Sequence, residues 1–200
     1  MKKKWTALLL TGAMALSLTA CGGQTTTTSS GSSGETGSGD ATYTVGICQL
    51  APHDALDAAT QGFKDALTEA LGDQVAFKEG NAGGEANNCT TIIDGFLSEG
   101  VDLILANATA SLTAAASATA DIPILGTAIT NYGVALNLDS TEDKVLGGNI
   151  SGTSDLAPLD QQAQLLQEMF PDAENVGLLY CSAEPNSVFQ VDTIQGYLED

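Results

Sequence analysis

The stretch Asp102-Leu103-Ile104-Leu105-Ala106 places four consecutive apolar residues behind one acidic residue. An uninterrupted apolar run of this kind is typical of a central strand in a parallel sheet, because helices cover both faces of such a strand. The stretch therefore predicts a sheet that continues on both sides of this strand and is covered by helices.

Short apolar segments alternate with helical patterns on both sides of this run. Strands are predicted over residues 43–48, 75–78 and 124–128, with one further short strand within 137–150. Helices are predicted over residues 55–71, 85–100 and 111–120, with Asp54 as the N-cap of the first and Gly72 after its end. The alanine-rich residues 108–120 contain several Ser and Thr and are expected to form a surface helix. This alternation predicts an α/β fold with a doubly wound parallel sheet.

A second strand–helix unit is predicted to follow. A helix is expected to open at residues 152–158 and to run to Phe170, followed by a strand over 176–180 and a helix from Asn186. The stretches Val45-Gly46-Ile47-Cys48 and Val176-Gly177-Leu178-Leu179 share a pattern, which suggests two lobes of one architecture, although any two such units look alike. One strand cannot form a sheet. We therefore expect a first lobe over 43–151 and the truncated beginning of a second over 152–200; the alternative is that these elements dock onto the first lobe.

The N-terminus has the organisation of an export signal. Three lysines over residues 2–4 precede an almost uncharged run over 5–18, which is too short for a stable membrane span. The stretch Leu18-Thr19-Ala20-Cys21 resembles the lipobox of bacterial lipoproteins, which implies cleavage before Cys21 and a lipid on its sulfur. The alternative is an ordinary signal peptide with an incidental cysteine. Residues 1–20 are thus predicted to be a signal peptide, and the polar residues 21–42 a flexible linker.

Composition excludes several classes of function. The net charge of -19 becomes -22 once the three signal lysines are removed, and the chain contains no arginine. Such an acidic surface repels phosphate backbones, so nucleic-acid binding is not expected. His53 is the single histidine, so neither a metal centre nor a Ser-His-Asp triad is expected, and phosphate-binding glycine motifs are missing. No cofactor and no enzymatic activity are predicted, and no later segment is long and apolar enough to cross a membrane.

Several phrases together resemble the tryptophan/tyrosine-type substrate-binding proteins of ABC transporters. In chain order they are His53-Asp-Ala-Leu-Asp-Ala-Ala59, Gln61-Gly-Phe63, Ala108-Thr-Ala110, Asp121-Ile-Pro123, Gly152-Thr-Ser-Asp155, Asn186-Ser-Val188 and Gln190-Val191. The resemblance implies a periplasmic-binding-protein type I fold, in which two similar lobes close on a small ligand for delivery to a membrane permease. Members of this family are longer than this chain. One departure is Asn131-Tyr132, where Asp-Pro is expected, and this puts the identity of the ligand in doubt.

This resemblance implies a lipid-anchored extracytoplasmic protein that captures a small ligand, with an aromatic amino acid as the first choice, for the permease of an ABC importer. A sensing or adhesion lipoprotein with the same fold and no transport role is the alternative. An enzyme is the weaker rival, since the residues that a hydrolase would need are missing.

Ligands of doubly wound sheets bind where strands end and helices begin. Without arginine, the carboxylate of an amino acid must be held by helix N-termini and hydroxyls. The residues expected to do so are Thr109, Ser111, Thr127 and Thr130. Asp155 is expected to hold the ammonium group, and Gln49, Ser154, Tyr180, Asn186 and Ser187 to complete the site, with Tyr132 and Tyr180 as aromatic walls. The alternative for Asp155, Ser111, Asn186 and Ser187 is helix capping.

The cysteines allow one further expectation. Cys48 ends the first predicted strand and Cys89 lies early in the helix after the second, so in a doubly wound sheet their sulfur atoms approach each other. An exported protein permits a disulfide. A Cys48–Cys89 bond is predicted, with two buried thiols as the alternative, and Cys181 is expected to be free.

Overall fold

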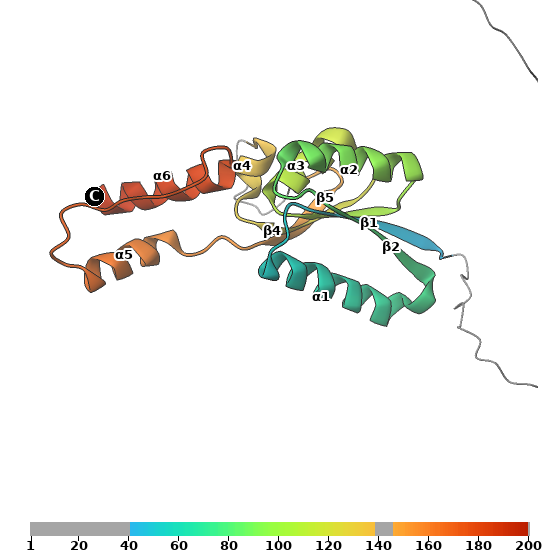
Figure 1. Cartoon of the computed structure of the whole chain (residues 1–200), viewed down its shortest axis with the longest axis horizontal. Coiled ribbons are helices and arrows are strands. Elements are labelled where there is room, and N and C mark those ends of the chain that lie inside the picture. The colour runs from blue at the N-terminus through green and yellow to red at the C-terminus, as the bar shows by residue number, and fades with distance from the viewer. Residues whose placement is uncertain (1–40, 139–145, 200) are drawn as a thin grey trace, which may run out of the picture. The chain divides into compact units, whose positions relative to one another are not determined.

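The computed structural model describes residues 41–138 and 146–199, in which strands and helices alternate (Figure 1). The elements are β1 (Tyr43–Gln49), α1 (Asp54–Leu71), the 3-10 turn η1 (Gly72–Gln74), β2 (Val75–Asn81), α2 (Ala86–Glu99), β3 (Leu103–Asn107), α3 (Thr109–Ala118), β4 (Ile124–Ile129), α4 (Tyr132–Leu136), β5 (Ile150–Ser154), α5 (Leu159–Met169) and α6 (Pro185–Glu199). Among these residues no helix combines the length and the apolar character needed to span a bilayer. The predicted signal peptide, Cys21 and nearly all of the predicted linker lie outside the described residues.

The five strands form one parallel sheet in the order β2-β1-β3-β4-β5. The apolar run that follows Asp102 forms β3, which lies at the centre of the sheet. Ile104 and Leu105 are 0% and 2% exposed and belong to apolar clusters on opposite faces. The prediction of a central parallel strand and of an α/β doubly wound sheet is therefore confirmed.

Helices cover both faces of this sheet, as Figure 1 shows for α1 on one side and α2 and α3 on the other. The larger apolar cluster joins the sheet to α2, α3 and α4 and includes Cys89, Ile93 and Leu112, all of them fully buried. The smaller cluster centres on Ile47 and Leu105 and packs against the apolar face of α1. This arrangement leaves the carboxyl ends of the strands to define one edge, where the loops to the following helices meet.

Two expectations about the helices are wrong in detail. His53, not Asp54, is the N-cap of α1, because its Nδ1 accepts a hydrogen bond of 3.2 Å from the Ala55 amide. The alanine-rich helix α3 is not a surface helix: Ser111 and Leu112 are fully buried. Its small side chains and its Ser and Thr hydroxyls allow it to lie closely against the sheet. β2 also continues to Asn81, beyond the predicted end at Lys78.

The last strand and the helix after it lie later than predicted. Of the range 137–150, in which a strand was expected, only Ile150 belongs to β5, and residues 139–145 lie outside the described residues. The helix expected from 152 begins only at Leu159, with Pro158 at its N-cap. Residues 150–154 are extended because they pair with β4, with Ile124 opposite Ile150 and Gly126 opposite Gly152. β5 thus spans the predicted boundary between residues 151 and 152, and the two-lobe organisation stays a prediction.

The strand expected over residues 176–180 does not form in the described part of the chain. These residues have no neighbouring strand to satisfy their backbone groups, and Leu179 is 100% exposed. The short helix α4 was not predicted, since a five-residue helix gives little periodic signal.

Candidate functional site

Three side-chain amides stand in register at the carboxyl edge of the sheet. Gln49, the last residue of β1, lies opposite Asn81 of β2 on one side and Asn107 of β3 on the other. Thr127 of β4 lies opposite Asn107 in turn. Polar side chains therefore line the strand ends at the place where ligands of parallel sheets bind.

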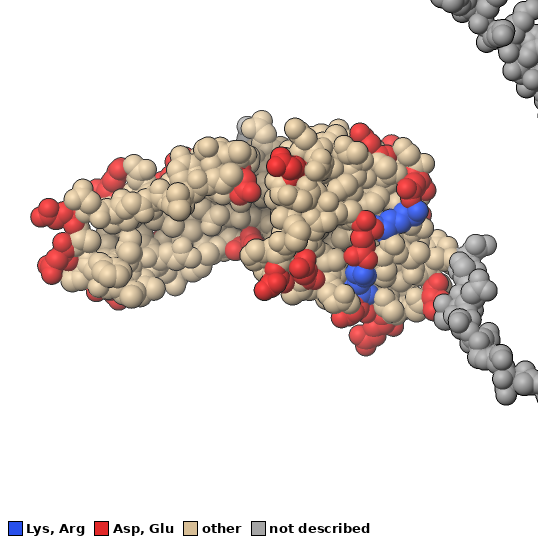
Figure 2. All heavy atoms as spheres, in the orientation of Figure 1, with Lys and Arg blue, Asp and Glu red and all other residues tan. Residues whose placement is uncertain are grey.

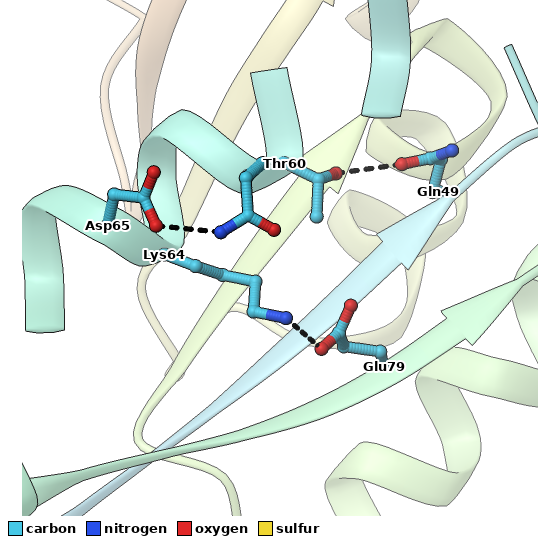
Figure 3. A network of polar contacts seen from close by, with 6 residues as sticks. Gln49, Thr60, Lys64, Asp65 and Glu79 are labelled. Carbon is cyan, nitrogen blue, oxygen red and sulfur yellow. Dashed lines mark hydrogen bonds and ion pairs between the residues drawn. The ribbon is translucent and has the colours of Figure 1, made fainter. Parts of the chain in front are cut away.

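The Gln49 amide is occupied by bonds within the protein. Its Nε2 donates to Asp57 Oδ1 at 2.6 Å and to the Ala51 carbonyl at 2.8 Å, and its Oε1 accepts from Thr60 Oγ1 at 2.8 Å. Figure 3 shows the bond from Thr60 in α1 to Gln49 at the end of β1. Gln49 thus fastens the first turns of α1 to the sheet, and its part in ligand binding stays a prediction.

Asn107 is a residue of this network that the sequence analysis missed. It is fully buried, and its Nδ2 donates to the Leu56 carbonyl at 2.8 Å and to Thr60 Oγ1 at 2.9 Å, while its Oδ1 has no partner. The available signal was its place directly after the apolar run of β3, since a polar residue that ends a buried strand points to the carboxyl edge.

The two described lysines are each paired with an acidic neighbour. Lys64 forms an ion pair with Glu79 and lies over the Phe77 ring, 5.7 Å from its centre, while Lys78 forms an ion pair with Glu99. Figure 3 shows the first pair, and Figure 2 shows the positive side chains next to acidic ones. Both of these lysines are paired, and the described residues at this edge offer an anion amides and hydroxyls.

The N-terminus of α3 provides such amides. Its N-cap residue, Ala108, adopts φ 88° and ψ 160° and offers no capping side chain, whereas His53 caps α1 and Asn131 caps α4. Thr109 begins the helix and lies at one end of a hollow of about 480 Å³ that runs between α2 and α3 to Ala118. An uncapped helix N-terminus carries partial positive charge and favours a carboxylate.

Ser111, in the first turn of the same helix, is engaged otherwise. Its Oγ accepts a hydrogen bond from Cys48 Sγ at 3.6 Å and lies 3.5 Å from Cys89 Sγ. All three side chains are fully buried. Cys48 and Cys89 are free thiols in the structure rather than a disulfide, and Cys181 is free and exposed. The hydroxyl of Ser111 thus serves the sulfur cluster, and its contact with a ligand stays a prediction.

The ends of β4 and β5 bring three predicted residues together. Ser154 Oγ donates to the Thr130 carbonyl at 3.0 Å, and the Asp155 amide donates to the Ile129 carbonyl at 3.1 Å. Thr130 and Ser154 line a hollow of about 520 Å³. The Asp155 side chain is exposed. This position leaves a carboxylate available at the strand ends.

Tyr132 follows the end of β4, and its side chain joins β4 to β5. Its side chain is 8% exposed, and its hydroxyl donates to the carbonyls of Gly126 at 3.0 Å and Thr153 at 3.2 Å. Burial, with a smaller contribution from the charge of Asp155, raises the pKa of Tyr132 to about 12. The hydroxyl is bonded to β4 and β5, while Tyr132 also lines the hollow at Thr130, so its role as an aromatic wall for a ligand stays a prediction.

The remaining predicted residues lie elsewhere. Thr127 lines a hollow of about 290 Å³ on the α1 face of the sheet, together with Phe63. Tyr180 is half exposed in a cavity of about 630 Å³ between α5 and α6. Asn186 and Ser187 lie in the first turn of α6, and Ser187 Oγ donates to Glu184 Oε2 at 3.0 Å, so neither the ligand contact nor the helix-capping alternative is decided for them.

Comparison with known proteins adds a family to this geometry. Residues 44–200 match the model of the family described as ABC transporter substrate binding protein. The chain is 36% identical over 199 residues to a protein of Clostridioides difficile named tyrosine-binding protein, covering 98% of this chain and 57% of that protein.

Solved structures agree with this match. An ABC domain from Streptococcus pneumonia in complex with L-Trp has a TM-score of 0.72 and 34% identity, over 80% of this chain and 54% of the other. A ligand-free, open substrate-binding protein with adhesive properties from Clostridium difficile has a TM-score of 0.61 and 37% identity, over 78% and 54%. The chain thus spans little more than half the length of these relatives.

Proposed function

Because the chain belongs to the family of ABC transporter substrate-binding proteins, we propose that it captures a small ligand outside the cytoplasm for an ABC importer. The family match, which extends from the first strand to the end of the chain, carries this proposal. The geometry supports it, since the uncapped N-terminus of α3 and the exposed Asp155 both lie at the carboxyl edge of the sheet. In this reading the protein binds and releases its ligand without changing it, and it needs no cofactor.

The ligand that we propose is an aromatic amino acid. Two relatives are described by the tyrosine or the L-Trp that they bind. The first-turn amides of α3, with the Thr109 hydroxyl, would bind the carboxylate, and Asp155 would bind the ammonium group. The residues that follow β5 would contribute to a second lobe, whose Tyr180, Asn186 and Ser187 complete the site as the two lobes close on the ligand.

A binding measurement uses a property of the sequence. Trp5 is the single tryptophan and lies in the predicted signal peptide, so the chain from Gly22 has none. The emission of added L-Trp therefore reports its own environment. Binding of L-Trp would shift its emission to shorter wavelength and raise its anisotropy. An excess of L-Tyr would reverse both changes because it competes for the same site. Unchanged emission and a flat calorimetric titration with both amino acids would remove the aromatic ligand from the proposal.

The role of Asp155 has a matched control. Asp155→Ala removes the proposed partner of the ammonium group, and we expect affinity to fall about tenfold or more, with little change in stability because the side chain is exposed. Asp172→Ala changes an exposed acid outside the proposed site and should leave affinity unchanged. Equal affinities for the two variants would reject the assignment.

The anchor is part of the same proposal. Lipid on Cys21 would hold the protein at the membrane, and residues 21–42 would act as a flexible tether beside the permease. Cells that express the protein should incorporate an alkyne-labelled fatty acid into it. Cys21→Ser should prevent labelling and release the protein from the membrane fraction. Labelling of the Cys21→Ser variant would contradict the anchor.

One relative has adhesive properties, which supports a second candidate function, a lipoprotein that adheres or senses without transport. Uptake of labelled ligand by cells separates the two. Loss of uptake on deletion of the gene supports transport, whereas unchanged uptake with reduced attachment to a surface supports adhesion.

A further inference from the structure

The buried sulfur cluster on the α2 and α3 face of the sheet serves no step of ligand binding. It consists of Cys48 in β1, Cys89 in the first turn of α2, and Ser111 in the first turn of α3. We propose that Cys48 and Cys89 are a redox pair, which closes to a disulfide in an oxidising compartment and so fastens α2 to the sheet.

The fold places both sulfur atoms against one hydroxyl. Cys48 is flanked in the sheet by Gly80 and Ala106, so no large neighbour separates it from the helix above. Its Sγ and that of Cys89 both lie within 3.6 Å of one atom, Ser111 Oγ. Both cysteines are 0% exposed and share one apolar cluster. Two buried sulfur atoms that contact the same hydroxyl are neighbours, and a disulfide further requires their Cβ atoms to come within about 4.5 Å of each other.

Position makes Cys89 the better nucleophile, since it lies in the first turn of α2, where the helix N-terminus favours an anion. The neighbouring Cys48 thiol lowers the pKa of Cys89, and Ser111 acts in the same direction against the opposing effect of burial. The same interaction with Cys89, together with burial, raises the pKa of Cys48. Cys89 is therefore the sulfur that ionises first, and the thiolate is the reactive form.

The oxidant is a disulfide, either a small molecule or an exported protein. The Cys89 thiolate attacks one of its sulfur atoms and forms a mixed disulfide, while the other sulfur leaves as a thiolate. Cys48 then loses its proton and attacks Cys89 Sγ, which expels the second thiolate. The pair gives up two electrons and two protons in total, and the oxidant becomes two thiols. Because both cysteines are buried, oxidation takes place during folding or when α2 opens locally.

The disulfide would restrict one of the loops that form the candidate site. Residues 82–85 connect the end of β2 to α2 and form one of the loops at the carboxyl edge, and Ala82 is buried. A Cys48–Cys89 bond closes a loop that contains all of α1 and β2. It therefore restricts the unfolded chain and holds the start of α2 against the sheet. The oxidising compartment belongs to the proposed function, but bond formation in purified protein is independent of ligand binding.

The test counts thiols in the chain from Gly22, which lacks Cys21 and retains three cysteines. The protein is refolded with oxidised glutathione and then denatured without reductant. We expect one free thiol, at Cys181, a peptide that links Cys48 to Cys89, and a melting temperature roughly 10 °C above that of the reduced protein. The double variant Cys48→Ala/Cys89→Ala should melt at one temperature in both conditions.

Three outcomes would overturn the proposal. They are three free thiols after oxidative refolding, a peptide that links Cys181 to either buried cysteine, and a Cys48–Cys89 bond that leaves the melting temperature unchanged. The comparison of oxidised with reduced protein uses the same chain, so it does not depend on how well the double variant folds. If the bond forms while L-Trp and L-Tyr fail to bind, the redox pair stands and the proposed ligand falls.

Discussion

Two stretches with the same sequence pattern adopt different structures in this molecule. Val45-Gly46-Ile47-Cys48 lies in β1, between β2 and β3, and Ile47 is 1% exposed. Val176-Gly177-Leu178-Leu179 forms no strand in the described part of the chain, and Leu179 is fully exposed. An apolar run gives a segment the capacity to be a strand, but it becomes one only when neighbours satisfy its backbone groups.

The largest effect is expected when an apolar side chain is removed from each stretch. Ile47→Ala leaves a cavity among Leu105 and the α1 residues packed on it, and we expect a loss of about 3–4 kcal/mol in the free energy of unfolding. Leu179→Ala should change it by less than about 0.5 kcal/mol, since the side chain makes no buried contact. Denaturant titration followed by circular dichroism measures both. Comparable losses would show that the second stretch is packed as tightly as the first.

The glycines of the two stretches provide a second test. A Cβ on Gly46 would lie 2.6 Å from the buried Phe96 ring, whereas nothing lies within 4 Å of the corresponding position on Gly177. Gly46→Ala should therefore cost about 2–3 kcal/mol, because the ring and α2 have to move. Gly177→Ala should stay within about 0.5 kcal/mol of the parent protein. A tolerated Gly46→Ala would mean that α2 shifts without cost, and it would weaken the comparison.

The sequence predicted those elements whose signals are local. The apolar run of β3, the helical period of α1 and the glycine after it depend on neighbouring residues alone, and each was predicted close to its observed place. β5 and residues 176–180 depend on whether a partner strand is present, which no local pattern contains. For that reason a segment with few apolar residues became a strand beside β4, while an apolar segment did not.

The candidate site divides in the same way. The carboxyl edge and the N-terminus of α3 follow from the order of the elements, so the sequence located them. Which polar groups at that edge are free to bind a ligand depends on contacts between residues that lie far apart in the sequence. Gln49 is tied to α1, Ser111 to two cysteines, and Tyr132 to β4 and β5. Asn107 was missed because its importance lies in bonds to α1.

A third prediction concerns where the well-packed region ends. Tyr132→Phe removes the hydroxyl that joins Gly126 in β4 to Thr153 in β5, and we expect a loss of about 1–2 kcal/mol. If β5 is as firmly held as β1, this loss is a loss in the free energy of global unfolding, and hydrogen exchange becomes faster throughout the sheet. A loss confined to faster hydrogen exchange at residues 150–154 would instead place the boundary before β5.

The same tyrosine gives a dependence on pH. Its pKa is raised to about 12 in the folded protein, above the value of about 10 for an unfolded chain, so the folded state holds the proton more tightly. Stability should be unaffected by this group below pH of about 10 and fall between about 10 and 12 as the unfolded state loses its proton first. Tyr132→Phe should remove this part of the slope. Identical slopes would show that other groups cause it.

The smallest expected effect concerns backbone strain, which also differs between the two regions. The described residues other than glycine with positive φ are Ala108, Ala128 and Asn137, all before residue 155. Strain of this kind persists only where surrounding contacts fix the backbone. Ala108, at φ 88° directly before α3, adopts a conformation that glycine enters freely.

Ala108→Gly should therefore raise the free energy of unfolding by about 0.5–1 kcal/mol, because relief of strain outweighs the added freedom of the unfolded chain. Ala157→Gly, in a segment without positive φ, should lower it slightly. Opposite signs for one substitution at two places would separate a backbone held by its surroundings from one that follows its own preference. If Ala108→Gly is also destabilising, the strain at α3 is smaller than its φ implies, and the first turn of that helix would be as adaptable as residues 155–158.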